Sequence, residues 1–152
     1  MTLLERLHDL GILIIPLAYK TKLPLVKWGK YIENPPTDRE LRYWFPKDGH
    51  WNAAAVTGMK NLVVIDFDDY KAFSSWSNTE RGTATRDTLR VATNRGVHVY
   101  LFCDILPRGG PFSGGDVKSW GGYVLIPPSV HPLGMVYREI VDNAPILKVN
   151  SI

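Results

Sequence analysis

Two aspartates in one short segment, Asp66 and Asp68, have the type and spacing that metal chemistry needs. They end the run Leu62-Val63-Val64-Ile65-Asp66-Phe67-Asp68, which has the composition of a buried strand. Alternate strand residues share a face, so the two residues are expected in one site, with their Cα atoms about 6.5–7 Å apart. Mg²⁺ or Mn²⁺ would offset the repulsion between the carboxylates, because hard cations prefer oxygen ligands. The alternative, equally favoured by this segment alone, is that Asp68 and Asp69 begin a surface turn or cap a helix at Tyr70.

A histidine follows a glycine-containing turn. Asn94, Arg95 and Gly96 resemble a turn, and His98 then enters an alternating apolar segment, which predicts a strand. From the start of that strand His98 can donate a hydrogen bond to a phosphate oxygen, and Arg95 can add positive charge. A hydrogen-bonded structural histidine on a half-buried strand is the alternative.

A carboxylate and an amine are paired in the glycine-rich segment 114–122. Asp116 and Lys118 are two positions apart, so they are expected on one face of a strand. A metal-binding carboxylate beside a lysine that meets a phosphate suits phosphoryl transfer. The alternative is a cross-strand ion pair on a solvated face.

Two polar side chains lie in the proline-rich segment 127–132. Its prolines restrict the backbone around Ser129 and His131, and both side chains can contact phosphate. A plain turn is the alternative.

Four lysines and two aromatic residues lie in the segment 19–36: Lys20, Lys22, Lys27, Lys30, Trp28 and Tyr31. Such a loop can hold a template strand by phosphate contacts and base stacking. The alternative is a solvated loop whose aromatic residues pack inward.

The elements that must position these residues follow from the hydrophobic pattern. Helices are expected over 2–10, with Thr2 as N-cap, and over 37–45, where Thr37 and Glu40 form a capping box. A third helix over 70–76 is only weakly indicated. Strands are expected over 12–17, 53–57, 62–68, 88–93, 97–102, 116–120, 123–126 and 135–141. The pattern predicts an α+β fold with a helical N-terminal layer on a mostly antiparallel sheet, forming a single domain over 1–152.

Composition limits the class of protein. The chain of 152 residues has a net charge of +3, which is only mildly basic. Cys103 is the single cysteine, so we expect no internal disulfide and no zinc site. The longest apolar run, Leu10 to Ala18, is too short to span a bilayer, and no signal peptide is evident. We therefore expect a cytoplasmic protein that does not interact with membranes.

In this order the segments resemble the primase–polymerase (prim-pol) domain of the archaeo-eukaryotic primase superfamily, as in plasmid and phage bifunctional DNA primase/polymerase replication proteins. The resemblance extends over most of the chain. It rests on the N-terminal helix with Gly11 and residues 14–17, Lys22-x-Pro24 with Trp28, and residues 52–58, 64–68, 93–98 and 116–137.

The resemblance implies a role for each candidate residue. The implied catalytic and metal-binding carboxylates are Asp66, Asp68 and Asp116. The implied nucleotide-binding residues are His98, Lys118, Ser129 and His131, with Arg95 beside them. The resemblance also implies an RRM-like sheet combined with a small N-terminal αβ unit, and an active site in the cleft between them.

The implied activity is template-dependent nucleotidyl transfer from NTP or dNTP, by two-metal catalysis with Mg²⁺ or Mn²⁺, on a single-stranded DNA template or primer. Neither the zinc-binding insertion of some relatives nor a helicase segment is present, so we expect primer initiation to need a helicase or accessory domain on another chain. One alternative is a catalytically silent module that binds nucleotides or single strands in a replication or defence complex. Another is a metal-dependent nuclease, although a phosphate clamp of His98 and Lys118 suits a triphosphate better.

Overall fold

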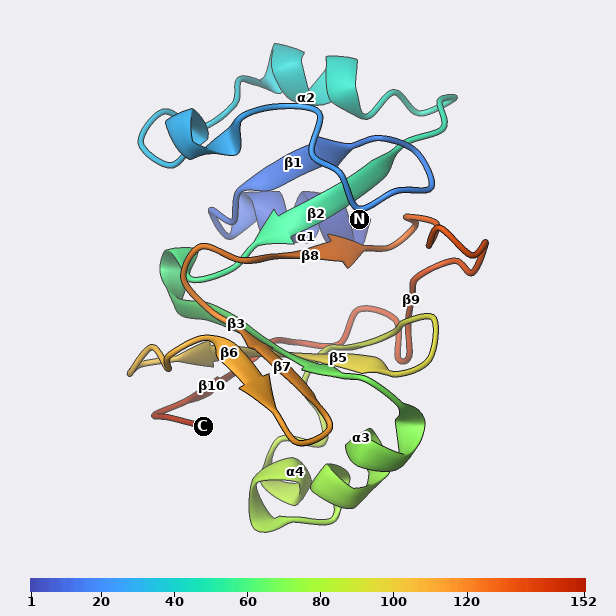
Figure 1. Cartoon of the computed structure of the whole chain (residues 1–152). Coiled ribbons are helices and arrows are strands. Elements are labelled where there is room, and N and C mark those ends of the chain that lie inside the picture. The colour runs from blue at the N-terminus through green and yellow to red at the C-terminus, as the bar shows by residue number, and fades with distance from the viewer.

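Two stacked β-sheets organise the chain (Figure 1). The computed structural model describes residues 1–152. A three-stranded sheet has the order β1-β2-β8, and a seven-stranded sheet has the order β6-β7-β3-β5-β4-β9, with β10 pairing with β5. All pairs are antiparallel except β10 with β5. The expected α+β fold with a mostly antiparallel sheet is therefore confirmed.

The three-stranded sheet and its helices form the N-terminal unit. Its strands are β1 (Ile14–Leu17), β2 (Asn52–Val56) and β8 (Tyr123–Ile126). Its helices are α1 (Leu3–Asp9), the 3-10 turn η1 (Trp28–Tyr31) and α2 (Asp38–Trp44). Both α-helices begin at a capping box, Thr2 with Glu5 and Thr37 with Glu40, because reciprocal side-chain contacts satisfy free N–H groups of the first turn.

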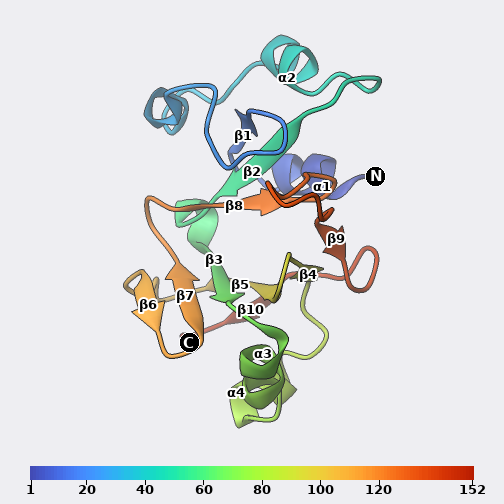
Figure 2. The same cartoon turned by 45° about the vertical axis from the view of Figure 1, so that its right-hand side comes forward.

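The seven-stranded sheet lies between this unit and two further helices (Figure 2). Its strands are β3 (Leu62–Phe67), β4 (Arg90–Ala92), β5 (Val97–Cys103), β6 (Gly110–Phe112), β7 (Gly115–Lys118), β9 (Arg138–Glu139) and β10 (Leu147–Val149). The 3-10 turn η2 (Met59–Asn61) precedes β3, and α3 (Tyr70–Ser77) and α4 (Glu80–Ala84) follow it.

The alternation of β3 separates two hydrophobic layers. Val63, Ile65 and Phe67 pack with Phe73 of α3, whereas Leu62 and Val64 belong to the core that the sheet shares with the N-terminal unit. Asp66 therefore shares a face with Leu62 and Val64 and points toward the three-stranded sheet.

The expected helices over 2–10 and 37–45 are confirmed, and so is the weakly indicated helix over 70–76. The bounds of several strands were wrong: the strand over 62–68 ends at Phe67, that over 116–120 is Gly115–Lys118, and those over 88–93 and 135–141 shrink to Arg90–Ala92 and Arg138–Glu139. The sequence pattern missed α4, β6 and β10, which are three to five residues long. None of the helices has the length and apolar character that crossing a membrane requires.

Candidate active site

Strand pairing brings three of the predicted residues side by side. Asp66 on β3 lies opposite His98 on β5 and opposite Asp116 on β7. Directly opposed residues of antiparallel strands have Cβ atoms about 4.5–5.5 Å apart. The three side chains therefore form a row across the middle of the sheet, on the face toward the N-terminal unit.

Two glycines allow the backbone to approach closely around Asp66. A Cβ on Gly115 would lie 2.0 Å from the Asp66 carbonyl oxygen, and a Cβ on Gly96 would lie 1.8 Å from that of Phe67. Any larger residue would push β7 or the β4–β5 turn away from β3. These glycines therefore keep the strands of the row in register.

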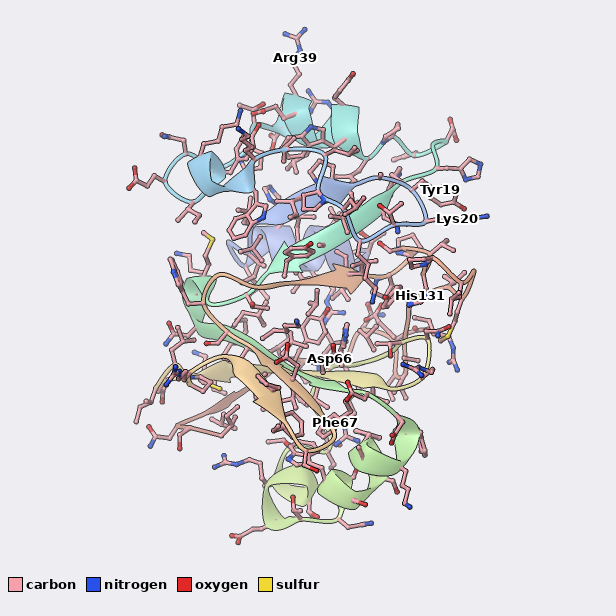
Figure 3. All side chains as sticks on the ribbon, viewed as in Figure 1. Tyr19, Lys20, Arg39, Asp66, Phe67 and His131 are labelled. Atoms are coloured by element: carbon pink, nitrogen blue, oxygen red, sulfur yellow. The ribbon has the colours of Figure 1, made fainter.

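Asp66, which lies between the two sheets (Figure 3), and His98 line a hollow. The hollow has two adjoining parts of about 370 and 380 Å³. Lys22, Asp66, His98 and Tyr137 line both parts. Asp68, Arg95 and His131 are among the residues of the first part, and Lys118, Gly121, Gly122 and Tyr123 among those of the second. A larger hollow of about 530 Å³ between α1 and α2 contains none of these residues.

Each carboxylate of the row has a partner with a nitrogen donor. His98 Nε2 lies 3.3 Å from Asp66 Oδ1, and Lys118 Nζ lies 2.7 Å from Asp116 Oδ2. Burial alone would raise the pKa of Asp66, but His98, Lys118 and Lys22 together lower it. The Asp66 carboxylate is therefore ionised and ready to bind a cation without releasing a proton.

The other half of the predicted acidic pair lies outside the strand. Asp68 follows the end of β3, is exposed and lines the hollow, and its N–H donates to the Gly114 carbonyl. Asp69 caps α3, because its Oδ1 accepts from the Ala72 N–H at 2.7 Å. The helix cap therefore belongs to Asp69, which leaves the Asp68 carboxylate facing solvent at the edge of the hollow.

The carboxylates fit a hard cation by type and by position. Asp66 and Asp116 are direct neighbours across two strands, and Asp68 follows two residues after Asp66. As the side chains stand, no three His, Cys, Asp or Glu groups converge closely enough to hold a metal ion. A cation would therefore have to draw the carboxylates together, in competition with the contacts to His98 and Lys118.

The two residues of the proline-rich loop have different surroundings. Ser129 is fully buried, and its hydroxyl accepts from the Ala53 N–H at 2.8 Å and donates to the Ala53 carbonyl at 3.0 Å. It does not line the hollow, so its position does not support the predicted phosphate contact. His131 does line the hollow, and the pKa of its imidazole is lowered by burial and by the charges of Lys22 and Arg95.

Sequence reasoning assigned Lys22 to a template loop and gave Tyr137 no role, yet both line the whole hollow. The Tyr137 ring lies 6.1 Å from His98 and 6.3 Å from His131 between ring centroids. Burial and the charge of Asp66 raise its pKa to about 12. For Lys22 and Tyr137, the only sequence feature that indicated a place in this site is the resemblance, which includes both positions.

The predicted base stacking at Trp28 and Tyr31 is wrong for Tyr31, which is buried and donates its hydroxyl to Glu40 at 2.7 Å. Trp28 is half-buried and packs against the same core. Both aromatic residues anchor the loop from inside, because apolar ring surface is more stable out of water.

Comparison with known proteins identifies a family for the chain. Residues 4–151 match the family Prim-Pol, described as bifunctional DNA primase/polymerase, N-terminal. No individually curated protein matches the sequence. Because the match covers nearly the whole chain, this protein belongs to the Prim-Pol family of bifunctional DNA primase/polymerase N-terminal domains.

Proposed function

We propose that this chain is a template-dependent nucleotidyltransferase that joins nucleotides from NTP or dNTP along a single-stranded DNA template. The carrying observation is the row of Asp66, His98 and Asp116 on three adjacent strands, of which Asp66 and His98 line the hollow. It supplies carboxylates for cations and donors for phosphate within one small area, which is what phosphoryl transfer requires.

Asp66, Asp116 and Asp68 are the residues that would hold divalent cations, the cofactor type that this family typically uses. Carboxylate oxygens favour Mg²⁺ or Mn²⁺ over softer metals. When bound, two such ions activate the attacking hydroxyl and neutralise the charge of the leaving pyrophosphate.

The contacts of Asp116 with Lys118 and of Asp66 with His98 orient these groups in the free protein. Lys118 and Asp116 neutralise each other at 2.7 Å. A cation on Asp116 and a phosphate on Lys118 would satisfy both charges again, so the exchange leaves neither charge unpaired. His98 changes partner in the same way, from the Asp66 carboxylate to a phosphate oxygen. Both residues thus position the triphosphate and balance its charge.

Three further side chains support a triphosphate in the first part of the hollow: the cationic Lys22 and Arg95, and the imidazole of His131. They come from three different loops, so a ligand bound among them is contacted from several sides. Contributions of this kind act through positioning and charge, without covalent chemistry.

A catalytically silent nucleotide-binding module is the second candidate. One observation favours it: no three metal-ligating side chains converge as they stand. The two candidates differ in whether cations draw the carboxylates together.

The deciding experiment is primer extension with Mn²⁺, dNTP or NTP and a labelled primer on a single-stranded template. The wild type should extend the primer, and Asp66→Asn should lower the rate by at least about 10²-fold, as expected for loss of a central electrostatic contact. The exposed Asp142 provides the matched control, since Asp142→Asn should leave the rate unchanged.

Three other outcomes contradict the proposal. Nucleotide binding without extension would establish the silent module, and shortening of the strand would establish a nuclease. Equal rates for the wild type and Asp66→Asn would show that the row is not the reacting centre.

A further inference from the structure

The loops that rim the first part of the hollow carry basic residues and no acidic ones. Three loops contribute, residues 18–26, 93–96 and 127–137, and they contain Lys20, Lys22, Arg95 and His131 but no Asp or Glu. Lys22, Arg95 and His131 line the hollow itself. Asp66 and Asp68 also line this part of the hollow, so the positive charge is confined to the loops around them, where it favours a polyanion.

An exposed pair of aromatic rings lies beside this rim. The Tyr19 and His50 ring centroids are 5.2 Å apart, with 38° between the ring planes. Tyr19 lies two residues after the end of β1 and His50 two residues before the start of β2, at the end of the ladder where Leu17 lies opposite Asn52. The Tyr19 residue is 39% exposed and His50 is exposed. Two rings held together at the surface offer a stacking face to a third ring.

A lysine accompanies the rings. Lys20 Nζ lies 5.6 Å from the Tyr19 ring centroid, and its side chain is exposed. Tyr19 and Lys20 lie on the same side of the molecule as His131, next to the rim (Figure 3). The nearby loop before β2 adds Lys47 and Asp48, whose charges offset each other.

Hydrogen bonds fix the loop that carries Tyr19 and Lys20. Asn52 Nδ2 donates to the Thr21 carbonyl at 3.0 Å and to the Val130 carbonyl at 2.8 Å. The Tyr123 hydroxyl donates to the Lys22 carbonyl at 2.9 Å. The loop is thereby tied both to the 127–137 loop and to β8, so a strand bound on it has a defined distance to Asp66. Such preorganisation reduces the entropic cost of binding.

We propose that Tyr19, His50 and Lys20 form a platform that holds the unpaired DNA template just outside the hollow. A nucleobase stacks on the ring pair, Lys20 contacts a backbone phosphate, and the strand continues past Lys22 toward Asp66. The combination of stacking rings with cations is the way single strands are held without sequence preference. A duplex does not fit this platform, because its bases are already stacked on each other. That the bound strand is a template leading to Asp66 rests on the proposed function. The binding itself can be measured without catalysis.

The test is fluorescence anisotropy with a labelled oligo-dT of about a dozen nucleotides, without metal or nucleotide, on the full chain. Tyr19→Leu should weaken binding roughly tenfold, within the range for loss of one stacked base, whereas Tyr19→Phe should bind like the wild type. Lys20→Gln should lower the slope of log K against log salt by about 0.7, the value for one phosphate contact on a single strand. Glutamine suits this position because Lys20 has a φ of 60°, and both side chains carry the same Cβ strain.

Matched controls lie on α2, where Tyr43 is 84% exposed and Arg39 points away from the molecule (Figure 3). Tyr43→Leu and Arg39→Gln should leave the affinity and the salt slope unchanged. The platform is overturned if the wild type does not bind the oligonucleotide, if it binds a duplex more tightly, or if Tyr19→Leu and Tyr43→Leu behave alike. Equal losses for Tyr19→Leu and Tyr19→Phe would also overturn it, since phenylalanine keeps the ring.

Failure of the proposed function gives a different result. The protein could bind single strands through the platform and yet never extend a primer. That outcome would support this inference and refute the proposed polymerase activity. If extension occurs, Tyr19→Leu should raise the template concentration for half-maximal rate while leaving that for dNTP unchanged.

Discussion

At the scale of single residues, Asp66 is central because it has a chemically useful neighbour on each side. His98 opposes it on β5 and Asp116 on β7. The His98 Nδ1 atom is buried and makes no hydrogen bond, so the imidazole is oriented through Nε2 and Asp66 alone. Such a histidine can change partner at little cost when a phosphate enters, because no second bond has to break.

His131 supports a prediction about pH. Its pKa in the free protein is lowered by burial and by Lys22 and Arg95, so the ring is neutral at pH 7. A bound triphosphate would offset those charges and raise the pKa. The complex should then bind more protons than the free protein between the two pKa values, and affinity for a nonhydrolysable triphosphate should rise as pH falls through that window.

NMR titration of the His131 ring with and without the nucleotide measures this shift. Lys22→Gln should raise the pKa of His131 in the free protein, because one of the charges that lower it is gone. An unchanged His131 pKa on nucleotide binding would show that the triphosphate does not lie in this part of the hollow.

Spacing in the sequence predicted which residues of the site share a strand face, but not which strands meet. The period-two rule placed Asp116 with Lys118, and the turn before residue 97 indicated His98 at a strand start. The register that sets Asp66 opposite both neighbours depends on long-range pairing, which no local pattern contains. For the same reason Ser129 looked like a phosphate ligand, although its hydroxyl is used by Ala53 of β2.

At the scale of elements, the site depends on how closely β7 approaches β3. Gly115 lies opposite Phe67, and a Cβ there would meet the Asp66 carbonyl oxygen. We predict that Gly115→Ala destabilises the fold by about 1–3 kcal/mol, the usual cost of overpacking, and also displaces Asp116 from Asp66. Urea unfolding measures the first effect and primer extension the second.

Gly29→Ala is the control for this change, because a Cβ at Gly29 meets nothing within 4 Å. Its stability should stay within about 0.5 kcal/mol of the wild type, as for other surface substitutions. If Gly115→Ala proves as mild as Gly29→Ala, the close approach of β7 to β3 is not what holds the row together.

Elements with strong local signals were predictable, and those decided by pairing were not. The capping box of Thr37 and Glu40 gave the start of α2 correctly, because cap contacts are made within a few residues. β10 covers only Leu147–Val149 and exists because β5 offers it a free edge. Such a three-residue strand carries too few positions for any periodicity to appear.

At the scale of the whole molecule, the two sheets that line the hollow share one hydrophobic core. The largest cluster of 22 buried residues joins α1 and the three-stranded sheet to Leu62, Val64 and Tyr100 of the larger sheet. The sheets are also linked where Thr57 donates its hydroxyl to the Ser119 carbonyl. Neither sheet can therefore move far from the other without exposing apolar surface, which fixes the distance across the hollow.

We propose on these grounds that residues 1–152 unfold as one domain, which tryptophans on the two sides can report. Trp44 packs against the shared core and Trp76 packs against the cluster on the far face of the large sheet. In 5-fluorotryptophan-labelled protein, the fluorine signals of both should disappear at the same urea concentration. Leu7→Ala, which empties a fully buried position of α1, should cost about 2–5 kcal/mol and shift both signals equally. Earlier loss of the Trp44 signal alone would show that the N-terminal unit folds separately, and the hollow would then be a movable junction between two units.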